Sequence, residues 1–458
     1  MPLTSFKLTN KKLTIVPSMD RSRLDDIEKT SPSTGNETVS EYPDCDDVLP
    51  PTHEHRHRTV VLCFDGTGDQ FDEDNSNVVN FFSMLKKGDS KDQLVYYQVE
   101  AHTDDSDNYF DEAGDKICIF EEHVGLLPKS NLQQVPFAYK MYCREDVLGW
   151  RQSTAFKKAF SIDVDIELLG VWETVGSVGM IPKRLPFTTS NTHVKYFRHA
   201  LALDEHRVRF KPNFWNRPTP HEVNLGVRKG QMPRPKPKRQ TTRDFEKAYT
   251  HGMEHATDVE EVWFAGCHCD VGGGAVRNEV RNSLARIPLR WMVRQCFLLK
   301  TGILFYKEMF KVIGMDPNSV YPVVKPRPPP VTALSTPHSA EVRYLSVIGE
   351  NQTIVDVSDF VSEEEEDLAD ALSPINDMLR IAKTWWLLEY LPQKIKYQGD
   401  DDIWVNELMI NRGHGRVIPR QQSGIKVHRS VKLRMEHGGM NYVPRAMWNK
   451  DIEPEWID

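Results

Sequence analysis

The stretch Thr59-Val-Val-Leu-Cys-Phe64, followed at once by Asp65-Gly-Thr-Gly68, decides the fold class. A continuous apolar and β-branched run of this length is typical of a strand buried on both faces, and the glycines after it indicate a turn. Helical spacing follows over 77–85, and the next strand is expected over 93–97. Strand, helix and strand in this order predict a parallel α/β unit.

Further strands and helices continue the same alternation. We expect strands over 116–120, 165–172 and 261–266, and helices over 131–143, 243–252 and 284–299. Parallel strands joined by helices form sheets that are covered on both sides. The sequence therefore predicts an open, mostly parallel sheet with helices on both faces.

Shifts in composition predict four parts of the chain. Residues 1–57 are rich in Ser, Thr, Asp, Glu and Pro and are expected to form a disordered lead-in. The α/β domain is expected over 58–320, with a basic, proline-rich insertion at about 216–243. A proline-rich linker over 321–345 then precedes a helical carboxy-terminal extension over 346–458, which we interpret as a lid or satellite subdomain.

Two runs stand out within that extension. Residues 362–367 read Ser-Glu-Glu-Glu-Glu-Asp, and residues 381–390 have the apolar spacing of an amphipathic helix. The second run is the basis for predicting a helical extension.

Charge and cysteine content limit the classes of partner. The chain has 58 Lys and Arg against 66 Asp and Glu, a net charge of −8, which predicts no nucleic-acid partner. Its seven cysteines are scattered and lack the paired spacing of zinc sites, as expected of a reduced cytoplasmic protein without a bound metal. No run of about 18 apolar residues occurs, so no transmembrane segment is expected. No cofactor motif is recognised, and the oligomeric state is left open.

Three expected strands end on side chains that could carry chemistry. Asp65, Glu173 and His268 follow the first strand, the strand over 165–172 and the strand over 261–266. Ligands of parallel α/β sheets bind at the carboxyl ends of the strands. A carboxylate followed much later by a histidine is the chain order of acid and base in α/β-hydrolases, where the nucleophile precedes both. In such a site histidine takes the proton of the nucleophile, and the carboxylate orients the histidine.

Six blocks in a fixed order carry a family resemblance. They are Phe64-Asp-Gly-Thr67, Asn77-Val-Val79, Val95-Tyr-Tyr-Gln98, Gly170-Val-Trp-Glu-Thr-Val-Gly-Ser-Val-Gly179, His199-Ala-Leu-Ala-Leu-Asp-Glu205, and Trp263-Phe-Ala-Gly-Cys-His-Cys-Asp-Val-Gly-Gly-Gly274. Over roughly 58–300 the chain resembles the uncharacterised α/β-hydrolase family that includes the catalytic domain of type VI secretion phospholipase effectors and many fungal proteins. The resemblance implies an α/β-hydrolase-like fold, a lipid or ester substrate, and peripheral contact with membranes.

The resemblance also implies the catalytic residues. The acid falls on Glu173, where the family usually has aspartate, and the base falls on His268. The serine is expected in a Gly-Phe-Ser-Arg-Gly-Ala elbow directly after Phe120, where this chain instead continues Glu121-Glu-His-Val-Gly-Leu-Leu-Pro128. No Gly-x-Ser-x-Gly occurs anywhere in the chain, so no nucleophile is assigned. The loss of the elbow and its helix is expected to uncover apolar surface on the order of several hundred Å².

Other residues are expected to shape the site or to support it. Asp65, Gly66 and Thr67 are candidates for the active-site floor or oxyanion region, and Asp270 is a further candidate. His199 is either catalytic or a buried structural histidine bonded to Asp204 or Glu205.

Three functions remain open at this point. The first is a phospholipase-like ester hydrolase of which this sequence is an incomplete version, because the losses leave the neighbouring motifs clean, as exon skipping or a faulty gene model would. The second is an inactive α/β-hydrolase scaffold, a pseudoenzyme, that binds partners through its basic insertion or its carboxy-terminal helices. The third is a metal-dependent phosphate hydrolase centred on Asp65, since a carboxylate beside glycine at a strand end also holds magnesium in phosphotransferases.

Overall fold

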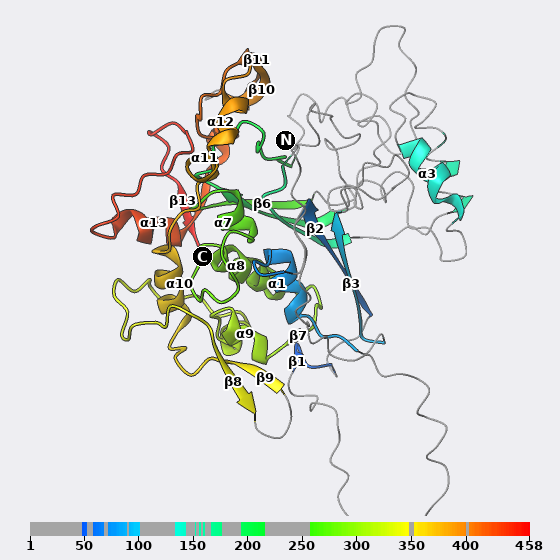
Figure 1. The fold of residues 1–458 in the computed structure, drawn as a ribbon. Coiled ribbons are helices and arrows are strands. Elements are labelled where there is room, and N and C mark those ends of the chain that lie inside the picture. The colour runs from blue at the N-terminus through cyan, green and yellow to red at the C-terminus, as the bar shows by residue number, and fades with distance from the viewer. Residues whose placement is uncertain are drawn as a thin grey trace, which may run out of the picture. The chain divides into compact units, whose positions relative to one another are not determined.

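Five parallel strands form the main sheet, which the computed structural model places in the order β13-β12-β6-β5-β4 (Figure 1). They are β4 (Ile166–Trp172), β5 (Val194–Ala202), β6 (Asp258–Phe264), β12 (Lys426–His428) and β13 (Glu455–Ile457). A mixed α/β protein with a parallel sheet is therefore confirmed. The strands expected over 165–172 and 261–266 correspond to β4 and β6.

The structure describes residues 48–52, 58–67, 72–88, 91–100, 133–142, 152, 155–156, 159–160, 166–175, 194–215, 257–347, 352–399 and 403–458. The strand expected over 116–120, the position after Phe120, the helix over 243–252, the basic insertion and most of the lead-in lie outside these residues. The predicted domain boundaries stay predictions.

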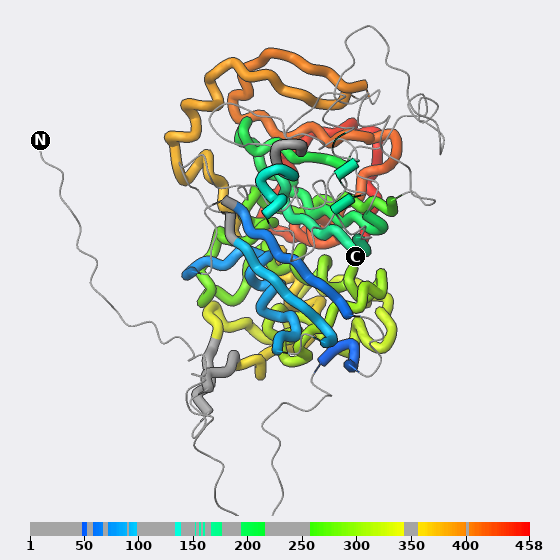
Figure 2. Tube along the Cα trace, turned by 90° about the vertical axis from the view of Figure 1, so that its right-hand side faces the viewer, coloured from blue at the N-terminus to red at the C-terminus, as the bar shows by residue number. Residues whose placement is uncertain are grey.

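Among the described residues, a second sheet contains β2 (Thr59–Thr67) and β3 (Gln93–Glu100), which run parallel and side by side (Figure 2). One face of this pair is buried, because Val61 and Cys63 pack against α1 (Asn77–Met84) and α8 (Arg286–Leu298). Alternate residues point to the other face. There, apolar side chains are 38% to 58% exposed, namely Val60, Leu62, Leu94 and Tyr96.

In the amino-terminal half and centre, each helix that the sequence predicts within the described residues is present. The helix expected over 77–85 is α1, the one over 131–143 is α3 (Val135–Tyr142), and the one over 284–299 is α8. Shorter elements complete this part: β1 (Val48–Leu49), which pairs antiparallel with β7 (Phe305–Tyr306), α7 (His268–Gly272), α9 (Glu308–Val312) and η5 (Pro317–Ser319).

The carboxy-terminal segment is not the helical extension that the sequence predicts. It contributes β12 and β13 to the main sheet and forms two antiparallel hairpins, β8 (Arg343–Val347) with β9 (Gln352–Asp356) and β10 (Gln393–Gln398) with β11 (Trp404–Met409). It also contains the short helical elements α10 (Glu363–Ala371), η7 (Gln421–Ser423) and α13 (Arg429–Glu436).

The single amphipathic helix expected over 381–390 is also wrong. This stretch is broken into α11 (Met378–Ile381), η6 (Lys383–Trp385) and α12 (Trp386–Glu389). The break falls at Ala382, whose backbone angles are not helical. Tertiary hydrogen bonds fix the broken form, because the buried Glu389 carboxylate accepts from the backbone N–H of Val208 and from Asn411. Contacts to distant residues therefore override the local apolar spacing.

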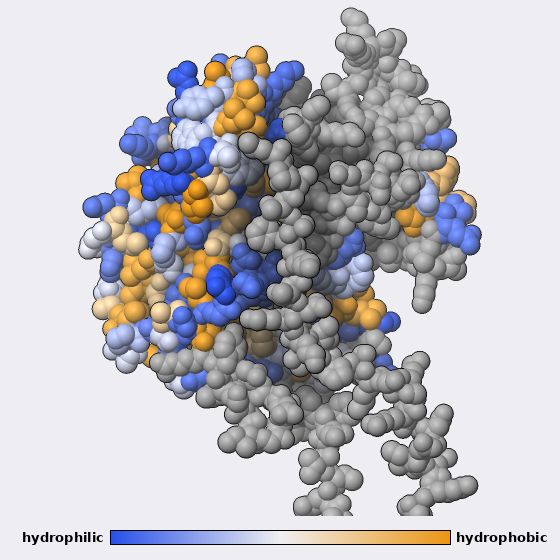
Figure 3. Space-filling view, viewed as in Figure 1, coloured by the Kyte–Doolittle hydropathy of each residue, from blue (hydrophilic) through white to orange (hydrophobic). Residues whose placement is uncertain are grey.

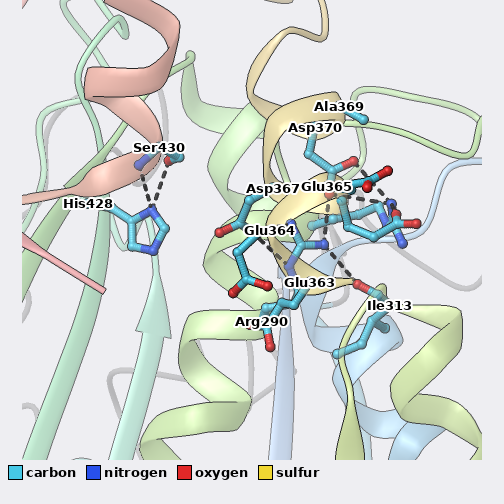
Figure 4. A network of polar contacts seen from close by, with 12 residues as sticks. Arg290, Ile313, Glu363, Glu364, Glu365, Asp367, Ala369, Asp370, His428 and Ser430 are labelled. Atoms are coloured by element: carbon cyan, nitrogen blue, oxygen red, sulfur yellow. Dashed lines mark hydrogen bonds and ion pairs between the residues drawn. The ribbon is translucent and has the colours of Figure 1, made fainter. Parts of the chain in front are cut away.

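The acidic run at the start of α10 is buried against α8. Three arginines spaced four residues apart on α8 face it, so that Arg294 pairs with Glu363 at 2.7 Å, Arg290 with Asp367 at 2.7 Å and Arg286 with Glu366 at 2.8 Å. Figure 4 shows Arg290 among these carboxylates. Arg327, from the proline-rich linker, adds contacts to Glu363, Glu364 and Asp367. The run is thus an internal ion-pair network that fastens the carboxy-terminal segment to α8.

This network makes stability depend on pH in the acidic range. Burial raises the pKa of Glu366, but the charge of Arg286 and hydrogen bonds from Arg286 and Arg281 outweigh burial and lower it from 4.5 to about 2. Because the folded-state pKa lies below the unfolded value, the stabilisation is fully present above about pH 4.5 and is lost as pH falls through about 2. We expect this residue to account for a loss of about 3 kcal/mol across that range.

Urea unfolding at pH 7, 4 and 3 measures the effect. The Glu366→Gln variant should be less stable than the parent chain at pH 7 and should lose less stability on acidification. Parallel pH profiles for the two proteins would contradict the prediction.

Candidate active site

Glu173 follows β4 directly, in a left-handed backbone conformation with φ of 51°. Such a conformation is uncommon for residues other than glycine and is found at sites where the surroundings enforce it. Here the backbone N–H of Glu173 donates to the carbonyl of Ala200 at 2.9 Å, and its Oε1 accepts from the N–H of Ala202. The side chain is therefore held over the end of β5, where small residues leave room for it.

His268 is the first residue of α7, which begins just beyond β6. The turn between them contains Gly266, with φ of 111°, where a β-carbon would lie 2.4 Å from Cβ of Asp270. Only glycine fits this position. Asp270 in turn accepts from the N–H of Cys267 at 2.8 Å and so caps α7. The turn and the cap together fix the direction in which the histidine leaves the sheet.

The two residues meet at the carboxyl ends of their strands. Nδ1 of His268 lies 3.0 Å from Oε2 of Glu173. The histidine side chain is 25% exposed, whereas the glutamate is buried. Within the described part of the chain, Nε2 of His268 has no assigned hydrogen-bond partner. Glu173 can therefore hold the proton on Nδ1 and leave Nε2 free to accept one, the arrangement of a general base oriented by a carboxylate.

Arg416 is the partner of Glu173 that the sequence did not indicate. Its Nη1 and Nη2 each lie 2.7 Å from one oxygen of the carboxylate, and its other donors reach the carbonyls of Ala202 and Phe210. The arginine is buried. Burial alone would raise the pKa of Glu173, but the charge of Arg416 and hydrogen bonds from His268 and Arg416 hold it well below its usual range. The acid therefore stays ionised at neutral pH.

Glu205 and Phe210 hold the histidine from the other side. The Glu205 carboxylate accepts from the backbone N–H of His268 at 3.2 Å and pairs with Arg207 at 2.8 Å. The Phe210 ring contacts the imidazole edge to face, with centroids 4.9 Å apart. The Arg207 guanidinium covers that ring at 3.5 Å. Both the backbone and the ring of His268 are thus supported.

Asp65 has a structural role, because its carboxylate accepts hydrogen bonds from three neighbouring residues. Its Oδ2 accepts from the Ser76 hydroxyl at 2.8 Å and from the Tyr97 hydroxyl at 2.7 Å, and its Oδ1 accepts from the N–H of Gly66 at 3.0 Å. Ser76 also caps α1. Asp65 thus ties β2, β3 and α1 together, while Thr67 ends β2 opposite Glu100. Among the described residues, no hydrogen bond joins Asp65, Gly66 or Thr67 to Glu173 or His268.

His199 lies on β5 away from the pair. It is fully buried, and its Nδ1 lies 3.7 Å from Oε1 of Glu261, its register partner on β6. Directly opposed residues of neighbouring strands point to the same face, which explains this partner. The partners suggested by the sequence bond elsewhere, Asp204 to the N–H of Gly266 and Glu205 to Arg207.

Asp270 joins α7 to the carboxy-terminal segment. Besides capping α7, it accepts from the backbone and side-chain nitrogens of Asn376, at 2.9 and 2.8 Å. No group of three or more His, Cys, Asp or Glu is arranged to bind a metal ion within the described ranges. Those ranges likewise contain no helix with the length and apolar character needed to cross a bilayer.

The fold and the site define a mixed α/β protein. At the carboxyl ends of its parallel strands lie the ionised carboxylate of Glu173 and the partly exposed imidazole of His268. The chain belongs to the family described as the catalytic domain of the T6SS Tle1-like phospholipase effectors. The family model matches residues 58–118 and 116–295, which is more than half of the chain.

A yeast protein and a bacterial structure are similar to the chain. The uncharacterized protein YEL023C of Saccharomyces cerevisiae is 22% identical, in an alignment covering 85% of this chain and 80% of the yeast protein. That alignment runs over 553 residues, more than the 458 of this chain, so the yeast protein has segments without a counterpart here. The crystal structure of an uncharacterized protein from Pseudomonas aeruginosa is 16% identical with a TM-score of 0.29, covering 54% of this chain and 46% of that one, less than half of its length.

Proposed function

We propose that this chain carries the acid and the base of a phospholipase-like serine hydrolase with an α/β-hydrolase fold, and that the segment bearing the serine is absent from this sequence. The observation that carries the proposal is the 3.0 Å contact between Nδ1 of His268 and Oε2 of Glu173, with the histidine side chain partly exposed to solvent. The family of the chain supports a phospholipid ester as the substrate class.

The chemistry expected of the complete site follows from the geometry of the pair. A serine hydroxyl would attack the ester carbonyl and give its proton to Nε2 of His268, while Glu173 stabilises the imidazolium that forms. The histidine would then return the proton to the departing alcohol, leaving an acyl-serine that water hydrolyses by the same two proton transfers. Without the serine, His268 and Glu173 have no hydroxyl group to activate.

Three observations support an absent segment, and two of them, the family match and the exposed sheet face, support a position after Phe120. The family match divides into two parts that meet at 116–118. The yeast relative has segments without a counterpart. The outer face of the pair β2 and β3 is apolar and exposed, with Val60 at 58% and Tyr96 at 51%. Parallel sheets are normally covered on both faces. A strand between β3 and β4 followed by a helix would join the two sheets and cover this face.

Sequencing the full transcript tests the proposal. We expect an in-frame segment after Phe120 that encodes Gly-x-Ser-x-Gly, and we expect the protein that includes it to hydrolyse a short-chain phosphatidylcholine. The present chain should show no hydrolysis above the background of its His268→Ala variant. A transcript without such a segment would reject the proposal and favour an inactive scaffold. Hydrolysis by the present chain that depends on His268 would show that it already contains a nucleophile.

A further inference from the structure

Residues 324–331, which read Val-Lys-Pro-Arg-Pro-Pro-Pro-Val, lie in the proline-rich stretch, and no helix or strand of the structure includes them. We call these residues the proline strip. A proline ring fixes its own φ at about −65° and directs the residue before it to an extended conformation. A run so rich in proline therefore forms a polyproline II helix, which has three residues per turn. In such a helix, residues three apart lie on the same face.

The burial of the proline strip follows this three-residue period. Val324 and Arg327 are three residues apart, and both are partly buried, so they form the inner face of the strip. The other two faces are exposed, and they consist of the pairs Lys325 with Pro328 and Pro326 with Pro329. The strip therefore rests on the protein along one face and presents proline rings to solvent along the other two.

Contacts along the inner face fasten the proline strip to the carboxy-terminal segment. The Arg327 side chain is only 5% exposed, and its Nη1 lies 2.9 Å from Oδ2 of Asp367 on α10. From α13, Nη1 of Arg429 donates to the carbonyl of Pro328 at 2.6 Å. In Figure 1 the yellow-green chain between α9 and β8 passes beside α10. The strip is stiff through its prolines and fixed in place by these contacts, so a partner that binds it has little chain entropy to remove.

The charge that the proline strip presents to solvent is positive. Arg327 is neutralised by the carboxylates of α10, whereas Lys325 is exposed and, within the described ranges, has no assigned ion-pair partner. Figure 3 shows hydrophobic residues interspersed with hydrophilic ones on the side of the molecule that carries α9 and α10. A partner surface that matches the strip therefore has apolar pockets for proline rings and a carboxylate for Lys325.

We propose that the proline strip is the docking site for a proline-recognition domain, a protein module with an aromatic-lined groove and acidic side chains at its rim. Such grooves bind a preformed polyproline II helix through prolines in the spacing Pro-x-x-Pro. Pro326 and Pro329 have this spacing on one exposed face. The inner face stays on this chain, so docking requires no unfolding. The proposal is independent of the proposed function, because it involves neither Glu173 nor His268.

An array of all SH3, WW and EVH1 domains of Saccharomyces cerevisiae, probed with the full chain, tests the proposal. We expect at least one domain to bind the parent chain. The variant Pro326→Ala, Pro329→Ala should bind that domain on the order of 100-fold more weakly, because two pockets of the groove are left unfilled. Lys325→Glu should bind about tenfold more weakly at low salt, with a smaller difference at high salt, because it reverses the charge that faces the acidic rim. Calorimetric titration measures these affinities.

The basic insertion provides the matched control, because it contains a second set of closely spaced prolines. The variant Pro233→Ala, Pro235→Ala should bind the same domain like the parent chain. Binding by none of the domains would overturn the proposal, and so would equal binding by the parent and Pro326→Ala, Pro329→Ala. A loss of binding confined to the control variant would place the contact in the basic insertion and would also overturn it. Thermal unfolding of each variant shows whether it is folded, and Lys325→Glu, which keeps every proline, provides an independent test.

Discussion

Replacing His268 with alanine in the protein that contains the serine segment is expected to lower kcat for phospholipid hydrolysis about a millionfold. Serine is a poor nucleophile at neutral pH unless a base removes its proton, and His268, 3.0 Å from the buried carboxylate of Glu173, is the base in the proposed function. Glu173→Gln keeps the shape of the acid but removes its charge, so we expect a loss of about 10⁴-fold. Initial rates on a short-chain phosphatidylcholine measure both effects.

A histidine outside the site provides the matched control. His437→Ala changes a partly exposed residue at the end of α13 and should leave kcat within about twofold of the parent. A loss of activity for His268→Ala no larger than that of His437→Ala would remove His268 from the mechanism. Equal activity of Glu173→Gln and the parent would leave the base in place and reject Glu173 as its orienting acid.

Residues with strong local patterns could be placed from the sequence. The apolar run at 59–64 forms β2, the helical spacing at 77–85 forms α1, and the strand-end positions of Glu173 and His268 bring those two side chains into contact. These patterns succeed because a buried strand and an amphipathic helix are each determined by nearby residues. The site pair succeeds because the carboxyl ends of parallel strands meet at one edge of a sheet.

The strand β5 could not be predicted in the same way. Its sequence mixes Lys195, Arg198 and His199 with apolar residues, so it shows neither a continuous apolar run nor a clean alternation. It is a strand because it lies between β4 and β6, with which it forms parallel ladders on both sides. The charges are compatible with this position because Arg198 binds Asp258 at 3.0 Å and Lys195 binds Glu167 at 2.7 Å. These partners come from neighbouring strands and are not visible locally.

The pairing of α10 with α8 could have been predicted from the sequence. Arginines at 286, 290 and 294 recur every four residues along an otherwise apolar helix and so form one charged stripe. A helix whose other residues are buried needs acidic partners for such a stripe. The run of glutamates over 363–366 is strongly acidic, and in the structure its carboxylates pair with these arginines. Comparing charge periodicity between distant segments would have indicated this contact.

Arg416 had no local signal, because it lies in a loop 243 residues from the acid that it holds. Its effect on stability can be measured in the present chain without any catalysis. We expect Arg416→Met to lower the free energy of unfolding by about 3–5 kcal/mol, since it leaves the buried charge of Glu173 without its main partner. The pKa of Glu173 should rise in this variant, because the charge and the hydrogen bonds of Arg416 no longer oppose the effect of burial. Urea unfolding at pH 7 measures the loss.

The double variant Glu173→Gln, Arg416→Met separates an unpaired charge from lost packing. If the buried carboxylate causes the loss, removing its charge should recover part of the stability, so the double variant should be more stable than Arg416→Met alone. Arg412→Met, an exposed arginine four residues earlier, should change the free energy of unfolding by less than about 0.5 kcal/mol. A double variant no more stable than Arg416→Met would mean that the arginine acts through its bonds to the carbonyls of Ala202 and Phe210.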